Sequence, residues 1–226
     1  MGCIRSNGNY PHLLAKAVQI GQLVDVSCSG ATTHDLASRM PLFEGGTLPP
    51  QDNALTRSTD LVTVGIGGND NGLFATILST CRQADGCGIS AELPELTATV
   101  DRLGPTLVAV LHRVRVRAPK AKILLIGYPK IAPDRGGCAQ LPQLAATNLG
   151  TINEVNLQLN NVMRAAARTA HVGFINVYQA SRGHDICSPS PWVNGTTTDV
   201  SAALALHPFA REQIAVARLI QNRIMQ

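Results

Sequence analysis

The chain has 226 residues, of which 45% are hydrophobic and 15% charged, a composition typical of a packed globular protein. The net charge of +4 is small, Lys and Arg are scattered, and aromatic residues are too few to interleave with them, so nucleic-acid binding is not indicated. No apolar run reaches the roughly 20 residues of a transmembrane helix, which argues against stable membrane insertion. We expect one domain over residues 1–226.

The first half of the chain alternates helices with strands. In chain order we expect a helix over residues 10–19, a strand over 23–27, a short helix over 34–39, a loop over 41–59, a strand over 61–66 and a helix over 72–80. Asn9 is a suitable N-cap for the first helix, and Thr32 or Thr33 for the second. The strand over 61–66 is a short, β-rich apolar run, and both strands end in small or polar residues.

The second half continues the alternation. Here we expect a helix over residues 95–116, a strand over 122–127, a loop over 128–148, a helix over 151–170, a strand over 172–177, a loop over 181–201 and a helix over 208–225. Gly104 and Pro105 should kink or restart the first of these helices, and Pro208 suits the first turn of the last. Alternating strands and helices predict a parallel sheet with helices on both faces.

Polar or small residues follow the predicted strands. Gly67-Gly68-Asn69-Asp70 follows the strand over residues 61–66, and Gly30 follows the strand over residues 23–27. Taken alone, such a tetrapeptide is more often a simple turn than a site. In open α/β sheets, however, the carboxyl ends of the strands face the ligand crevice. We therefore expect Gly30, Asn69 and His207, which precedes the last helix, to converge at one edge of the sheet.

The six cysteines fall into three sequence-local groupings, Cys3 with Cys28, Cys81 with Cys87, and Cys138 with Cys187. An even count without a CxxC pair disfavours a zinc site and fits disulfides in an oxidising compartment. The sequence leaves the connectivity open, and free buried thiols are the alternative. The chain shows no export signal at its start, although its cysteines indicate secretion, so we expect that it starts late.

Together, these motifs resemble those of the SGNH (GDSL) hydrolases. The resemblance rests on Cys-Ser-Gly-Ala-Thr at residues 28–32, Gly-Gly-Asn-Asp at 67–70, His207-Pro208 before an amphipathic helix, the opening CIRSNGNYP at 3–11, and His184, Asp185, Cys187 and Trp192. The opening and the cysteines are similar to those of the secreted, disulfide-containing actinobacterial lipases and esterases. The resemblance implies a three-layer α/β/α flavodoxin-like fold and ester hydrolysis without a metal or cofactor.

The resemblance also implies a role for each motif. Gly30 would donate its backbone N–H, and Asn69 its side-chain amide, to the oxyanion of a tetrahedral intermediate. His207 would be the general base. Many family members place an Asp three residues before this histidine, but here that residue is Leu204. The resemblance instead implies that a backbone carbonyl near Leu204 or Ala205 accepts the imidazole N–H; Asp199 and Asp185 are weaker candidates.

The family's first block, a central strand ending in Gly-Asp-Ser with the nucleophilic serine, is missing from this chain. Its strand would lie between residues 23–27 and 61–66, leaving both with unpaired backbone groups. Ser6, Ser27 and Ser29 are poor substitutes. A late start explains the missing strand, serine and signal together. We therefore expect a secreted serine-dependent carboxylic ester hydrolase; the alternatives are an inactive relic or ligand-binding module with the same fold, and an unrelated disulfide-bonded α/β domain.

The sequence says little about the substrate. The long loops after the strands should wall the pocket, and their few aromatics offer no platform for stacking sugars. This favours small-molecule or lipid esters over polysaccharide acetyl groups as substrates. We expect the protein to act as a monomer.

Overall fold

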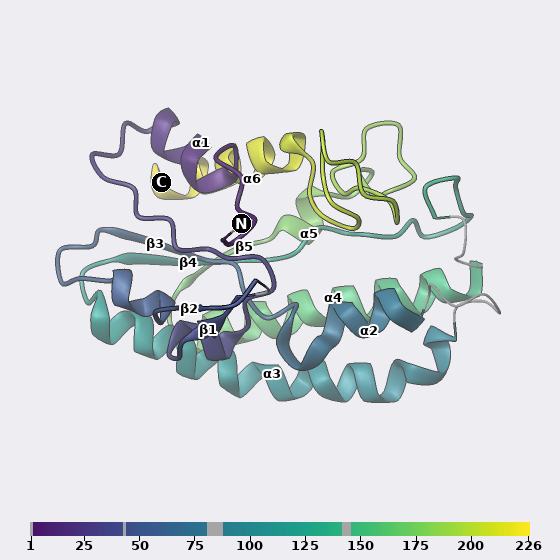
Figure 1. The fold of residues 1–226 in the computed structure, drawn as a ribbon, viewed down its shortest axis with the longest axis horizontal. Coiled ribbons are helices and arrows are strands. Elements are labelled where there is room, and N and C mark those ends of the chain that lie inside the picture. The colour runs from purple at the N-terminus through teal and green to yellow at the C-terminus, as the bar shows by residue number, and fades with distance from the viewer. Residues whose placement is uncertain (1, 43, 81–87, 142–145) are drawn as a thin grey trace.

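The structure is a computed structural model that describes residues 2–42, 44–80, 88–141 and 146–226. A parallel sheet with strand order β3-β4-β5 forms the middle layer (Figure 1). Helices α3 and α4 cover one face of this sheet and α1 and α6 the other. The bounds are α1 Tyr10–Ala17, β3 Leu61–Val64, α3 Ile89–Arg117, β4 Lys122–Ile126, α4 Ala146–Thr169, β5 Gly173–Ile175 and α6 Ala210–Ile224. The predicted three-layer α/β/α fold is confirmed.

Strand β4 joins the two halves of the core. It pairs in parallel with β3 on one edge and with β5 on the other. Ile123 and Leu125 point into the apolar cluster shared with α3 and α4, whereas Leu124 and Ile126 point into the cluster shared with α1 and α6. All four side chains are buried, as expected for a strand that is covered on both faces.

Several helix boundaries differ from the expected ones. Helix α3 begins at Ile89 and continues through Pro94 and Pro105 to Arg117, so it does not restart at Gly104. A proline removes one backbone hydrogen bond from a helix, and the buried face of α3 packs along α4 and outweighs that loss. Helix α6 has Phe209 as its N-cap, so Pro208 precedes the helix and is not in its first turn.

The smaller elements lie mostly in the connections. They are η1 (Thr33–Leu36), β1 (Met40–Pro41), β2 (Thr47–Leu48), η2 (Gln51–Ala54), η3 (Asp70–Gly72), α2 (Leu73–Thr80) and α5 (Val177–Ala180). Strands β1 and β2 form a short antiparallel pair within the region expected to be loop. Asn9 caps α1, as predicted, by accepting a hydrogen bond from the backbone N–H of His12. Thr32 is the N-cap of η1.

The predicted strand over residues 23–27 is wrong. This segment is neither helix nor strand, and residues 22–27 make no backbone–backbone hydrogen bond within the described chain. Leu23, Val24 and Val26 are exposed by 36%, 55% and 40%. Among the described residues, β3 pairs with β4 alone, so its other edge has no partner. A strand exists only where a neighbour completes its hydrogen-bond ladder, and none lies beside this segment.

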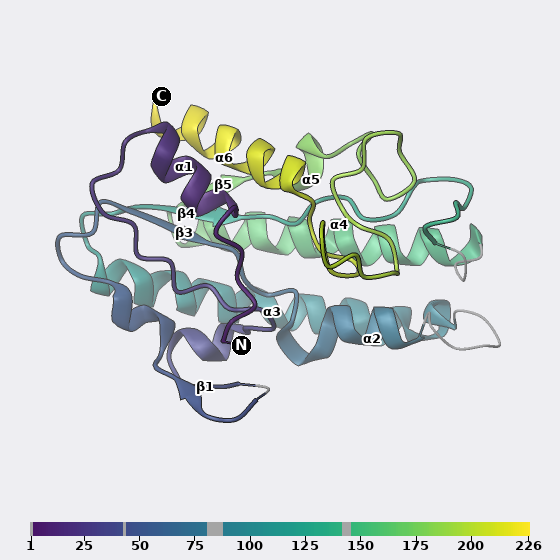
Figure 2. The ribbon, with the colours of Figure 1, turned by 45° about the horizontal axis from the view of Figure 1, so that its top comes forward.

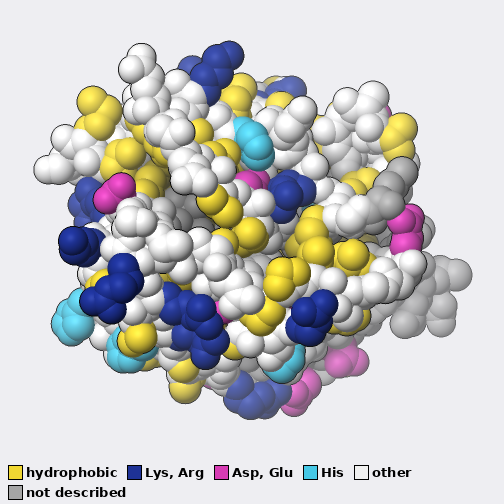
Figure 3. Space-filling model, turned by 60° about the vertical axis from the view of Figure 1, so that its left-hand side comes forward, with side chains coloured by type: hydrophobic (Ala, Val, Ile, Leu, Met, Phe, Trp, Pro, Cys, Tyr) yellow, Lys and Arg dark blue, Asp and Glu magenta, His cyan; other side chains and the backbone are white. Residues whose placement is uncertain are grey.

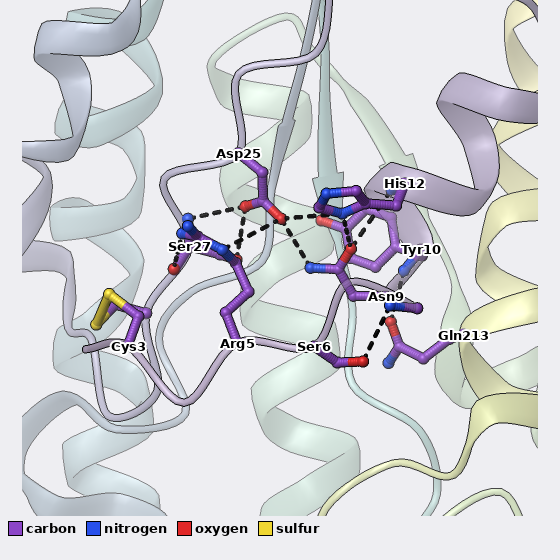
Figure 4. A network of polar contacts seen from close by, with 11 residues as sticks. Cys3, Arg5, Ser6, Asn9, Tyr10, His12, Asp25, Ser27 and Gln213 are labelled. Carbon is purple, nitrogen blue, oxygen red and sulfur yellow. Dashed lines mark hydrogen bonds and ion pairs between the residues drawn. A yellow bond between two sulfur atoms is a disulfide. The ribbon is translucent and has the colours of Figure 1, made fainter. Parts of the chain in front are cut away.

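A polar network holds the unpaired segment in place (Figure 4). The carboxylate of Asp25 accepts from Asn9 Nδ2 at 2.8 Å and from Ser27 Oγ at 2.7 Å. Arg5 Nε lies 3.7 Å and His12 Nδ1 3.6 Å from the same carboxylate. Partial burial acts to raise the pKa of Asp25, but the hydrogen bonds from Asn9 and Ser27 and the charge of Arg5 outweigh it and lower the pKa below its ordinary value. The segment is therefore fixed by side chains where a strand would be fixed by its backbone.

Two disulfides join further loops within the described residues. Cys3 is bonded to Cys28, and Cys138 to Cys187; Cys81 and Cys87 lie outside the described residues.

Three arginines near the end of α3, at positions 113, 115 and 117, serve the fold. Arg113 and Arg117 pair with the buried carboxylate of Asp52, and Arg115 donates to the carbonyl of Ala121 at 2.6 Å. Side chains of Lys and Arg gather at the lower left of the face in Figure 3. Near the centre of the same face, hydrophobic side chains surround a hollow. These contacts with Asp52 and Ala121 give the three arginines a structural role.

Candidate active site

The turn that carries Asn69 is packed tightly after β3. Gly67 has φ +115, which favours glycine, and a Cβ on Gly68 would collide with the ring of Phe74. The backbone N–H of Gly68 donates to the Tyr128 hydroxyl at 2.9 Å, and the rings of Phe74 and Tyr128 meet edge to face. Burial raises the pKa of Tyr128 to about 12, so this hydroxyl stays neutral and available as an acceptor.

The turn at Gly30 lies beside Asn69. Gly30 has φ +79, and its neighbours Ser29 and Ala31 donate their N–H groups to the carbonyls of Cys3 and Cys28. Asn69 Nδ2 donates to the carbonyl of Ala31 at 3.2 Å. The Gly30 N–H has no acceptor among the described residues, and one N–H of the Asn69 amide is also left over. The structure thus brings two of the three predicted site residues next to each other.

His207 sits in a tight turn ahead of α6. Leu206 has φ +58, and the His207 N–H donates to the carbonyl of Leu204 at 3.0 Å. The exposed imidazole places Nδ1 2.8 Å from the carbonyl oxygen of Ala205. Because a carbonyl can only accept, Nδ1 is the donor, and in the neutral form of the ring Nε2 then keeps its lone pair. The expected contact with a backbone carbonyl near Leu204 or Ala205 is confirmed.

Neither alternative carboxylate contacts the histidine. Asp199 accepts from the N–H and hydroxyl of Ser201, and Asp185 accepts from the N–H of Cys187. Two of the three candidate serines are engaged elsewhere as well. Ser27 donates to Asp25, and Ser6 accepts from the N–H of Gly8. Within the described chain, no serine hydroxyl is hydrogen-bonded to His207.

The His207 turn is tied to the loops at the carboxyl ends of the strands. The His207 carbonyl accepts from the N–H of Asn194, and the N–H of Phe209 donates to Trp192. Earlier in the same loop, the backbone N–H of Ile186 donates to the carbonyl of Ile131, which lies in the segment that follows β4. Tyr128, which holds the turn after β3, belongs to that segment too. Hydrogen bonds therefore link the surroundings of His207 and Asn69.

Comparisons with known proteins identify the family of this chain. The family model described as GDSL-like lipase/acylhydrolase matches residues 2–211. The chain belongs to this family. Lipase 2 of Streptomyces coelicolor, a curated relative, is 35% identical over 196 residues, which cover 82% of this chain and 64% of that protein. The chain thus spans less than two thirds of the length of this lipase.

Two crystal structures of other proteins share the fold over nearly the whole chain. Phospholipase A1 from Streptomyces albidoflavus superposes with a TM-score of 0.83 at 28% identity, covering 100% of this chain and 89% of that chain. An extracellular lipase from Streptomyces rimosus gives 0.81 at 30% identity, covering 98% and 88%. The family assignment made from the motifs is confirmed, and the two disulfides are consistent with secretion.

Two residues next to the site were missed in the sequence. Thr33 contacts the carboxylate of Asp70, and Tyr128 contacts Gly68. No local sequence pattern could indicate these contacts, because the first joins residues 37 positions apart and the second joins residues 60 positions apart. No helix of the described ranges is long and apolar enough to cross a membrane, and these ranges hold no cluster of three or more potential metal ligands.

Proposed function

We propose that this chain forms most of a secreted, serine-dependent carboxylic ester hydrolase. His207 is the general base, and Gly30 and Asn69 form the oxyanion hole. The nucleophilic serine comes from a Gly-Asp-Ser segment outside these 226 residues, carried on a strand that pairs with the open edge of β3. The expected substrates are small-molecule or lipid esters, as the names of the relatives suggest.

In this mechanism the serine oxygen attacks the ester carbonyl carbon while Nε2 of His207 takes the serine proton. The carbonyl oxygen becomes an oxyanion, which accepts from the Gly30 N–H and from the remaining N–H of Asn69 Nδ2. When the carbon–oxygen bond to the alcohol breaks, His207 returns its proton to the leaving oxygen. Water then repeats the two steps on the acyl-enzyme and releases the acid.

One observation carries the proposal. The exposed His207 donates from Nδ1 to the Ala205 carbonyl at 2.8 Å and so, in its neutral form, presents an unprotonated Nε2. A carbonyl fixes the ring and its tautomer but brings no negative charge, so it stabilises the imidazolium less than a carboxylate does. A dyad of serine and histidine is therefore the arrangement that these residues support.

The test compares the 226-residue chain with a longer product that includes the upstream reading frame. We expect the frame to encode Gly-Asp-Ser after a signal peptide, and the longer protein to hydrolyse p-nitrophenyl esters while the 226-residue chain does not. In the longer protein, His207→Ala should lower kcat by about 10³-fold or more. His112→Ala, a change at an exposed histidine on α3, is the matched control and should leave kcat unchanged.

Two results would contradict this proposal. A stop codon directly upstream, together with an inactive chain, would favour the relic or binding module. Strong activity of the 226-residue chain that is lost in Ser29→Ala would instead place the nucleophile within the chain.

A further inference from the structure

The carboxylate of Asp70 joins the two turns that carry Gly30 and Asn69. The backbone N–H of Thr33 donates to Asp70 Oδ2 at 3.0 Å and to Oδ1 at 3.3 Å, and the Thr33 hydroxyl donates to Oδ1. Both side chains are buried, with Asp70 exposed by 9% and Thr33 by 6%. A buried carboxylate with three such bonds is a strong and directional link between two loops.

This link lies directly beside both proposed oxyanion donors. Asp70 follows Asn69, and Thr33 comes three residues after Gly30. A second contact, from Asn69 Nδ2 to the Ala31 carbonyl at 3.2 Å, lies between the same two turns. If the Asp70 link is removed, the turns are free to separate, and Asn69 moves relative to the Gly30 N–H.

The carboxylate also comes at a cost to the fold. Burial raises the pKa of Asp70, and the neighbouring charge of Asp35 raises it further, whereas the bonds from Thr33 lower it. Asp35 is itself occupied, since its Oδ2 accepts from the N–H and hydroxyl of Thr32, each at 2.8 Å. Asp35 already completes the cap of η1. The carboxylate of Asp70 is therefore not needed for that cap.

We propose that Asp70 is a positioning residue that holds the neighbouring Asn69 in place against the turn of Gly30 by accepting from Thr33. This inference rests on the proposed function of those two donors. Asp70 acts through Asn69 and touches no substrate. Its loss should therefore weaken the binding of the transition state and leave the binding of the ground state nearly unchanged.

The kinetic test uses the longer, active protein. Asp70→Ala should lower kcat by about 10²-fold with KM within about 2-fold, because a displaced Asn69 can lose at most what its removal loses. Asp70→Asn should stay within about 10-fold of the parent kcat, since its oxygen still accepts from the Thr33 N–H while the hydroxyl of Thr33 accepts from its amino group. Asp101→Asn, which alters an exposed carboxylate that binds Gln158, is the matched control.

A double-mutant cycle separates positioning from general damage. In the Asn69→Ala background, Asp70→Ala should lower kcat by less than about 3-fold, because the group through which it acts is gone. If the two changes multiply, or if Asp70→Ala raises KM with kcat unchanged, the proposal is overturned. Thr33→Val and Thr33→Ser provide a second pair of variants. Thr33→Ser keeps the hydroxyl and should retain kcat, whereas Thr33→Val removes it and should lower kcat.

A crystal structure of the Asp70→Ala chain tests the same proposal without activity. We expect the Asn69 Nδ2 to lie beyond hydrogen-bond distance of the Ala31 carbonyl oxygen. An unchanged contact would overturn the positioning role. If the longer protein hydrolyses no ester, the proposed function fails, yet this structure still decides whether Asp70 positions Asn69.

Discussion

Strand β4 and the segment over residues 22–27 both carry apolar side chains and are opposite in structure. β4 has a partner on each edge and its last four side chains are buried. The other segment has no backbone partner within the described chain, and Val24 is 55% exposed. The difference teaches that an apolar run indicates a tendency to form a strand, and that the neighbouring strand decides whether it does.

Amide hydrogen exchange of the 226-residue chain should show the largest contrast. The amides of Leu124 and Leu125 lie in the paired core, so they should exchange only when the whole chain unfolds. Those of Val24 and Val26 have no acceptor in a ladder and should exchange at least about 10³-fold faster. Comparable protection at both places would show that the segment is paired in solution and would break the comparison.

Matched truncations should give the next largest contrast. Leu125 is fully buried, so Leu125→Ala should lower the free energy of unfolding by about 2–5 kcal/mol. Val24→Ala removes two methyl groups that are mostly in water and should cost less than about 0.5 kcal/mol. Urea unfolding of both variants measures this. A cost at Val24 near that at Leu125 would mean that residues 22–27 pack against a neighbour.

A further prediction concerns Glu212, at the start of α6 in the helical layer that α1 and α6 form. Tyr10 links this layer to β3, since its N–H donates to the side-chain oxygen of Gln213 at 2.7 Å and its hydroxyl to Thr63 at 3.3 Å. Glu212 is 4% exposed, and burial raises its pKa from 4.5 to about 8, while the bond from Gln213 acts in the opposite direction.

The sign of the resulting pH dependence follows from proton binding. Between these two pKa values the folded state holds a proton that the unfolded state releases. The free energy of unfolding should therefore be highest below the unfolded value and fall as pH rises toward the folded one, by at most about 1.4 kcal/mol per pH unit. Urea unfolding over this range should show that Glu212→Gln flattens the slope and that Glu154→Gln, on the exposed side of α4, does not. An unchanged slope in Glu212→Gln would contradict the assignment.

Much of the site was visible in the sequence, because its parts are local. Gly-Gly-Asn-Asp after an apolar run, and His207 ahead of an amphipathic helix, are short patterns whose chemistry depends on neighbouring residues. The family resemblance implied a backbone carbonyl as the partner of His207, and the Ala205 carbonyl, two residues away, is that partner. The roles of Gly30, Asn69 and His207 in catalysis stay predictions until the kinetic tests are made.

The sequence by itself determined the alternation of helices and strands, the fold class and the family, since these follow from periodicity and from motifs in a fixed order. The tertiary structure alone decided that residues 22–27 are unpaired, that α3 continues through two prolines, and that Asp70 holds Thr33. Each of these depends on a partner or a packing surface distant in the sequence. The energy of such contacts is set by proximity in space, and local patterns carry no record of it.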